Sequence, residues 1–169
     1  PPQMAYVLDH CYNEPELFRR ELLMDAIAVE ALAEALEVNP VFHNTSNNSQ
    51  RPVIEQLAVV LYRFGHYGNA AGLHKVAQWA GCAKGTVHLY TQRVMKAILS
   101  PSFLNSAVRL PTEEEKEKAK SWVEKTSGVP SWRDGWCFVD GTLIPLYVRP
   151  HWYGPSYFDR KCNYSLNIQ

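Results

Sequence analysis

The chain has 169 residues, of which 46% are hydrophobic and 20% are charged, the composition of one ordinary globular domain or two small ones. This composition excludes an intrinsically disordered chain, and charges interrupt every apolar stretch before it reaches the ~20 residues of a membrane span. The start, Pro1-Pro2-Gln3, lacks the basic and apolar regions of a secretory signal. It also lacks an initiator Met, so we expect a chain that is cut at its front.

The net charge is zero, but the charges are unevenly distributed along the chain. Residues 1–50 hold eight acidic and two basic residues, a net of −6, whereas residues 51–110 hold seven basic residues and one acidic residue, a net of +6. The segments 111–126 and 127–169 have nets of −1 and +1. The block 51–110 suits a polyanionic partner, although a solvated basic face has the same composition.

The first half of the chain is expected to be helical. Apolar residues recur near helical spacing over 15–38 and again over 52–64, and each segment begins near a proline. The polar stretch 44–49 predicts a linker between the two helices. The acidic N-terminal region is expected to dock a helix on the helix 52–64.

The next elements are a loop over 65–72, a short helix over 73–80, a longer helix over 84–99 and a second loop between Pro101 and Pro111. A capping box then begins a surface helix, with Thr112 as the N-cap residue and Glu115 three residues later. This helix should end near Gly128, because Pro130 blocks its continuation.

After the surface helix the residue pattern changes to β-branched and aromatic residues. This pattern predicts strands within 136–148 and over 164–168. Two such strands can form only a small antiparallel sheet with an exposed edge. The four cysteines form no CxxC pair, so we expect free thiols of an intracellular protein rather than a zinc or redox site.

The segment 73–99 has the spacing of a helix-turn-helix motif. Ala77 supplies the small residue where the helices cross, Gly81 suits the tight turn, and Val87 supplies the apolar plug between the helices. The second helix would begin near Lys84 and present side chains that reach phosphates or base edges. The expected DNA-contacting residues of this helix are Lys84, Thr86, His88, Thr91 and Gln92. A helical hairpin with a glycine turn and no DNA ligand would show the same spacing.

Asp140 lies directly after an apolar run and before Gly141-Thr142. A carboxylate at a strand end can bind Mg²⁺, and paired cations support phosphodiester chemistry when several carboxylates converge. Besides Asp140, only Asp134 and Asp159 are available after residue 126. A turn-forming Asp-Gly pair is the competing interpretation of Asp140.

Three segments resemble the start of the nuclease domain of PIF/Harbinger-type transposases, which are DDE-superfamily endonucleases, in a form similar to fungal ones. They are VDGTLIP at 139–145, GPSYFDRK at 154–161 and YSLNIQ at 164–169. The upstream segments 39–42, 51–53, 56–58, 61–65 and 85–87 also resemble that family. One departure is Cys162, which stands where many relatives carry a small residue such as Gly.

The resemblance implies a mainly α chain with a small β part, in which a helical, helix-turn-helix-containing region precedes the first strands of an RNase H-like α/β nuclease domain. The implied regions are 1–110, a linking helix over 111–128 and the nuclease start over 129–169. Asp140 matches the first catalytic, metal-binding Asp, and the second Asp and the Glu are expected beyond Gln169. The complete enzyme would use Mg²⁺ or Mn²⁺, but we expect no nuclease activity from this chain alone.

The implied partner is double-stranded DNA in the nucleus, with a possible accessory DNA-binding protein and no membrane. Arg160 and Lys161 would contact the DNA backbone, although a solvated loop explains them equally well. A domesticated or regulatory DNA-binding protein without catalysis is the main alternative. A basic block that binds an acidic protein is the third hypothesis.

Overall fold

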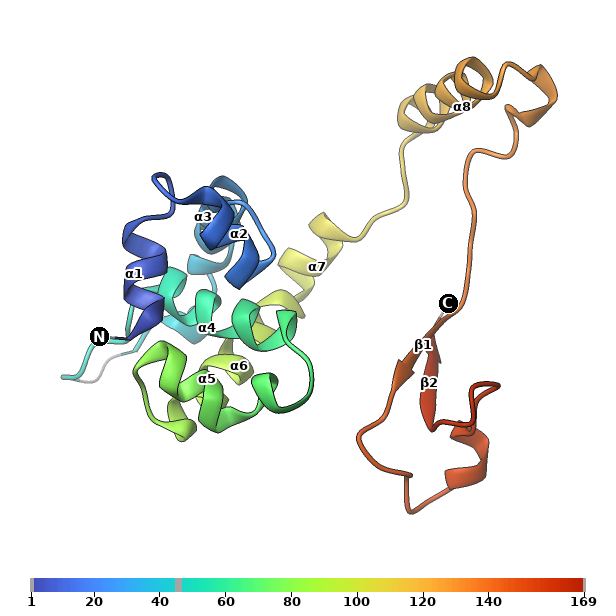
Figure 1. Ribbon diagram of the computed structural model, residues 1–169. Coiled ribbons are helices and arrows are strands. Elements are labelled where there is room, and N and C mark those ends of the chain that lie inside the picture. The colour runs from blue at the N-terminus through green and yellow to red at the C-terminus, as the bar shows by residue number, and fades with distance from the viewer. Residues whose placement is uncertain (1, 45–46, 169) are drawn as a thin grey trace. The chain divides into compact units, whose positions relative to one another are not determined.

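The computed structural model describes residues 2–44 and 47–168, and within them the protein is mainly helical with one small antiparallel sheet. The chain divides between Arg109 and Leu110 into two compact units, called unit 1 and unit 2 here (Figure 1). No helix among the described residues is both long and apolar enough to cross a membrane.

Unit 1 is built from helices. Its α-helices are α1 (Gln3–Asp9), α2 (Pro15–Leu22), α3 (Ala26–Glu37), α4 (Val53–Gly65), α5 (Leu73–Ala80), α6 (Lys84–Ile98) and α7 (Pro101–Ala107). Two short 3₁₀ helices, η1 (Pro40–Phe42) and η2 (Gly68–Ala71), lie before and after α4.

Helix α4 is the centre of unit 1. Its residues 56–60, which are Gln56 and four apolar residues, are all buried, so buried side chains point from it in several directions, as expected of a helix enclosed by its neighbours. Helices α2, α3, α5 and α6 all contact α4 (Figure 1). The predicted docking of the acidic N-terminal region on this helix is therefore confirmed, and two helices rather than one carry it.

The prediction of one helix over 15–38 is wrong, because the chain turns between α2 and α3. Leu23 adopts the left-handed conformation with φ 55°, and its N–H donates to the carbonyl of Arg19 at 2.8 Å. The Leu23 side chain lies over Gly65, where an added Cβ would come within 2.9 Å of Leu23 Cδ1. The turn lets both Leu22 of α2 and Val29 of α3 be fully buried.

Two further elements differ from the sequence-based expectations. The predicted loop after Pro101 contains α7, because proline fits the first position of a helix, where its missing N–H has no intrahelical partner. Helix α1 was not predicted, and it buries Met4 and Val7. The predicted linker 44–49 includes residues 45–46, which lie outside the described residues, and its other residues belong to no helix or strand.

The helices predicted at 52–64, 73–80 and 84–99 are confirmed to within one residue as α4, α5 and α6.

In unit 2, α8 (Glu113–Ser127) begins with the predicted capping box: Thr112 N–H donates to Glu115 Oε2 at 2.7 Å, and Glu115 N–H donates to Thr112 Oγ1 at 3.3 Å. The helix ends at Gly128, which has φ 67°.

Unit 2 continues through η3 (Pro130–Trp132) to strand β1 (Thr142–Pro145), then η4 (Gly154–Tyr157) and strand β2 (Ser165–Ile168). The strands pair antiparallel, with Thr142 opposite Ile168 and Pro145 opposite Ser165. The predicted small antiparallel sheet is thus confirmed, but the predicted strand over 136–148 is too long. Among the described residues, β2 pairs with only four residues of this segment, Thr142–Pro145, and no described strand pairs with residues 136–141.

Candidate nucleic-acid interface

Helices α5 and α6 are joined by a tight turn at Gly81, Cys82 and Ala83. Gly81 has φ 67°, which a residue with a Cβ adopts only with strain. The Cys82 N–H donates to the carbonyl of Ala77 at 3.0 Å, which closes the end of α5 in the manner of a glycine C-cap. The turn therefore fixes the direction in which α6 leaves α5.

The predicted inward residues Ala77 and Val87 lie in the core, together with two neighbours on α5. Val76 and Val87 are fully buried, and Ala77 and Ala80 are buried beside them. Helix α6 packs on both α4 and α5 along its buried face, which carries Val87, Tyr90, Val94 and Ala97. Ala77, the small residue that the spacing places between the two helices, is thus buried, and its role in a helix-turn-helix stays a prediction.

The outer face of α6 carries polar and basic side chains. Lys84, His88 and Gln92 are all exposed and follow one another at i, i+4 and i+8, so they form a row along the helix. Their side chains have no hydrogen-bond or ion-pair partner among the described residues. Helix α6 contains no acidic residue. We call these three residues the α6 row.

Two of the predicted contact residues are less accessible than the α6 row. Thr86 is half-buried in the first turn of α6. Thr91 is also half-buried, and its hydroxyl is engaged twice: Oγ1 donates to the carbonyl of Val87 at 2.8 Å and accepts from Arg63 Nη1 at 2.9 Å. The hydroxyl of Thr91 thus joins α6 to α4.

Arg63 is a residue that the sequence reasoning did not assign to this surface. It lies in the last turn of α4. Nothing in the sequence distinguishes it from the other six basic residues of the block 51–110. The contact to Thr91 shows its position, because it places one guanidinium nitrogen against the flank of α6. No sequence pattern indicates a pairing across 28 residues.

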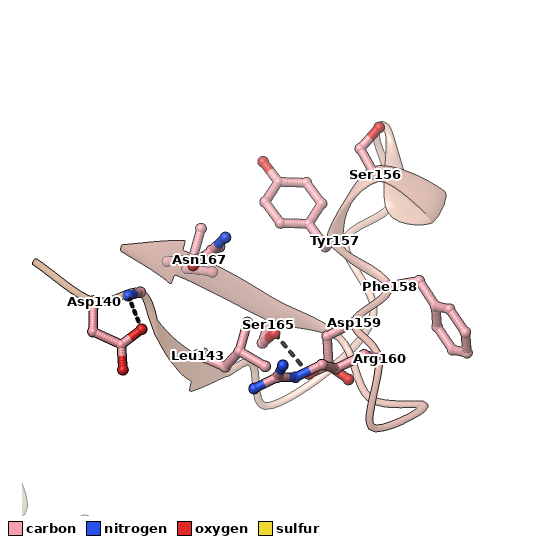
Figure 2. Close-up of a pocket in the computed structure, with 11 residues that line it drawn as sticks. Asp140, Leu143, Ser156, Tyr157, Phe158, Asp159, Arg160, Ser165 and Asn167 are labelled. Carbon is pink, nitrogen blue, oxygen red and sulfur yellow. Dashed lines mark hydrogen bonds between the residues drawn. The ribbon is translucent and has the colours of Figure 1, made fainter. Parts of the chain in front are cut away.

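Unit 2 contains a cleft of about 680 Å³ beside its two-stranded sheet (Figure 2). Asp140 lines it and is exposed, and one of its oxygens, Oδ1, accepts a hydrogen bond from the N–H of Gly141 at 2.7 Å. That local contact is typical of an aspartate in a turn. Arg160 also lines the cleft, and Figure 2 shows its side chain directed toward Leu143. Lys161 is exposed in the adjoining turn.

Asp159 holds the turn that precedes β2. Its Oδ1 accepts from the N–H groups of Lys161 and Asn163 at 2.7 and 3.0 Å, and its Oδ2 accepts from the buried hydroxyl of Ser165 at 2.7 Å. These bonds, first those from Asn163 and Ser165, lower the pKa of Asp159 because they favour the charged carboxylate. In the same turn, Cys162 has φ 59°, a conformation that glycine adopts without strain. The positive φ therefore explains why glycine would suit this position.

The described residues do not form a metal centre. They contain no group of three or more His, Cys, Asp or Glu side chains placed to share one ion. Asp140 lies before β1, at the edge of the sheet where β2 ends, whereas Asp159 lies before β2, at the opposite edge. The four paired residues between these edges span about 10 Å, at about 3.3 Å per residue. Both oxygens of Asp159 are already hydrogen-bonded. Asp140 is thus the one predicted ligand that faces the cleft with an unengaged oxygen.

No protein-family model matches the chain, and neither a curated protein nor a solved structure matches it.

Proposed function

We propose that unit 1 binds duplex DNA through α5 and α6, as the DNA-binding part of a PIF/Harbinger-type transposase that acts in the nucleus. The α6 row supports this proposal most strongly: three polar or basic side chains lie exposed on a helix that has no acidic residue. A helix with this face can enter the major groove, whose width admits one α-helix.

The chemistry of the row fits DNA. Lys84 at the start of α6 can neutralise a phosphate, and His88 can donate to one. Gln92, and Thr86 in the first turn, carry the amide and hydroxyl groups that read base edges. In this helix-turn-helix interpretation, α6 is the recognition helix and α5 crosses the DNA backbone.

For unit 2, the proposal rests on the resemblance of its segments to an RNase H-like nuclease start. Asp140 is the candidate for the first catalytic Asp, and its place in the cleft of Figure 2 is compatible with that role. Arg160 and Lys161 are candidate contacts to the DNA backbone. Mg²⁺ or Mn²⁺ would be the metal of the complete enzyme, held by Asp140 together with the further Asp and Glu that the resemblance implies.

A DNA-binding or regulatory protein without catalysis is the second candidate function. Unit 1 favours it, because the unit has its own buried core and presents the whole α6 row without help from unit 2. The two candidates share DNA binding and differ in whether Asp140 matters. If a longer chain carrying the missing acidic residues cleaves DNA, and Asp140→Asn abolishes cleavage but not binding, the transposase proposal is supported.

The test of DNA binding is the salt dependence of affinity for a short duplex, measured by fluorescence anisotropy between 50 and 200 mM salt. Lys84→Ala should weaken binding and reduce the slope of log K against log salt by about one unit. Lys125→Ala is the matched control, because it removes the same charge from an exposed position on α8 in unit 2. Equal effects of the two variants would contradict the proposal.

A further inference from the structure

Arg63 carries a positive charge that has no opposite charge beside it in the described part of the chain. It is half-buried at the end of α4, and no described carboxylate lies within ion-pair distance of it. Another arginine of the same block, Arg51, is instead paired with Glu55 at 3.6 Å. Half-buried charges are usually paired or used in binding, because removal from water disfavours the charged form.

Thr91 holds the guanidinium in one place. The hydroxyl of Thr91 donates its proton to the carbonyl of Val87, so its oxygen lone pairs remain to accept from Arg63 Nη1. This contact uses one of the five N–H donors of the guanidinium. The other four have no partner among the described residues, and they lie in a fixed fork that suits the oxygens of a phosphate.

The place of Arg63 connects it to the α6 row. Thr91 lies three residues after His88 and directly before Gln92, so the guanidinium lies beside the end of the row that carries His88 and Gln92. Helix α4 leads directly into η2, which packs against both α4 and α5. Arg63 itself lies where α4 meets α6, against the flank of α6 that carries Thr91.

We infer that Arg63 is a phosphate-binding residue of the DNA interface, positioned by Thr91. This inference rests on the proposed function, and it adds a contact from α4 to a surface that the sequence assigned to α6 alone. A phosphate contact fixes the register of a protein on DNA and carries no base specificity. Arg63 would thus set how deeply α6 enters the groove, while the exposed Gln92 faces the bases.

The experiment uses the full 169-residue chain and two short duplexes of unrelated sequence, with affinity measured as a function of salt. Arg63→Gln should reduce the slope of log K against log salt by about one unit and lower the affinity for both duplexes about tenfold. Arg63→Lys should keep the slope but bind more weakly than the natural chain, because it keeps the charge and loses the fork. Thr91→Val should also keep the slope and weaken binding, whereas Thr91→Ser should bind like the natural chain.

The outcomes separate this inference from the proposed function. If Lys84→Ala flattens the slope but Arg63→Gln changes neither slope nor affinity, Arg63 only braces α4 against α6, and the inference is overturned. If the natural chain does not bind either duplex at low salt, the proposed function and the inference fail together. If Arg63→Gln does not fold, as judged by circular dichroism, Arg63→Lys and Thr91→Val decide: unchanged affinity in both overturns the inference.

Discussion

The indole Nε1–H of Trp79 donates a hydrogen bond to Oε2 of Glu21 at 3.1 Å, which joins α5 to α2 across 58 residues. Tyr62 of α4 stacks on the same indole, with ring centroids 4.0 Å apart. Burial, and then the nearby charge of Glu21, raise the pKa of Tyr62. The acidic N-terminal helices are thus part of the structure that holds the first helix of the proposed DNA-binding pair.

Trp79→Phe should destabilise unit 1 by about 1–3 kcal/mol, because it leaves the largely buried carboxylate of Glu21 without its indole donor. The expected change is a lower midpoint of urea unfolding, followed by circular dichroism. Trp122→Phe is the control, since Trp122 is 65% exposed on α8 and has no such role. A Trp79→Phe variant as stable as the natural chain would show that the bond contributes nothing.

Gly81→Ala should destabilise the turn between α5 and α6. Gly81 has a positive φ, and an added Cβ would overlap the ring of Pro2, so the substitution introduces both backbone strain and a clash. We expect the strain alone to lower the free energy of unfolding by about 1–2 kcal/mol. DNA binding should also weaken, because α6 would leave the turn in a different direction.

Gly85→Ala should stabilise α6, in contrast to the destabilising Gly81→Ala. Gly85 lies in the first turn of α6, and an added Cβ meets no atom within 4 Å. Alanine is a better helix former than glycine, so we expect a gain of up to about 1 kcal/mol. Thermal unfolding of the two variants distinguishes them, and a stabilised Gly81→Ala would show that the turn tolerates a side chain.

The turn before β2 should depend on pH through Asp159. Its pKa is lowered from the ordinary value of 3.8 because the folded turn donates hydrogen bonds to the carboxylate. A carboxyl group with a lowered folded pKa stabilises the fold above its ordinary pKa, and this stabilisation is lost as the pH falls through the lowered value.

The amide signals of Lys161 and Asn163 in NMR spectra should therefore shift in acid, below pH 3.8, as their hydrogen bonds to Asp159 are lost. Asp159→Asn should remove this titration. If the two amides titrate in the Asp159→Asn variant as they do in the natural chain, another group controls the turn.

The elements of this protein were predictable where local rules decide them. Proline and the capping pair of Thr112 and Glu115 mark helix starts, and the helical periodicity of α4 is visible because its apolar residues recur at short spacing. The break at Leu23 was not predictable, because leucine rarely adopts a left-handed conformation, and its contact with Gly65 joins residues far apart in the sequence. Local propensity carries no information about that contact.

The candidate surface was predictable only in part. The spacing of Ala77, Gly81 and Val87 indicated which face of α6 would be outward, and Lys84, His88 and Gln92 lie on that face. The engagement of Thr91 was not indicated, because its partner Arg63 comes from a helix far away in sequence. In unit 2, Asp159 was considered as a carboxylate ligand, whereas its hydrogen bonds make it the organiser of a turn.

The central claim is that the outer face of α6 contacts duplex DNA, and NMR mapping of the full chain with a short duplex tests it most directly. We predict that the amide signals of Lys84, Gly85, His88 and Gln92 shift on addition of DNA at low salt and return as salt is added. The exposed residues of α2 and α3, such as Glu16 and Glu34, should not shift. Shifts confined to other surfaces, or no shifts at all, would contradict the account.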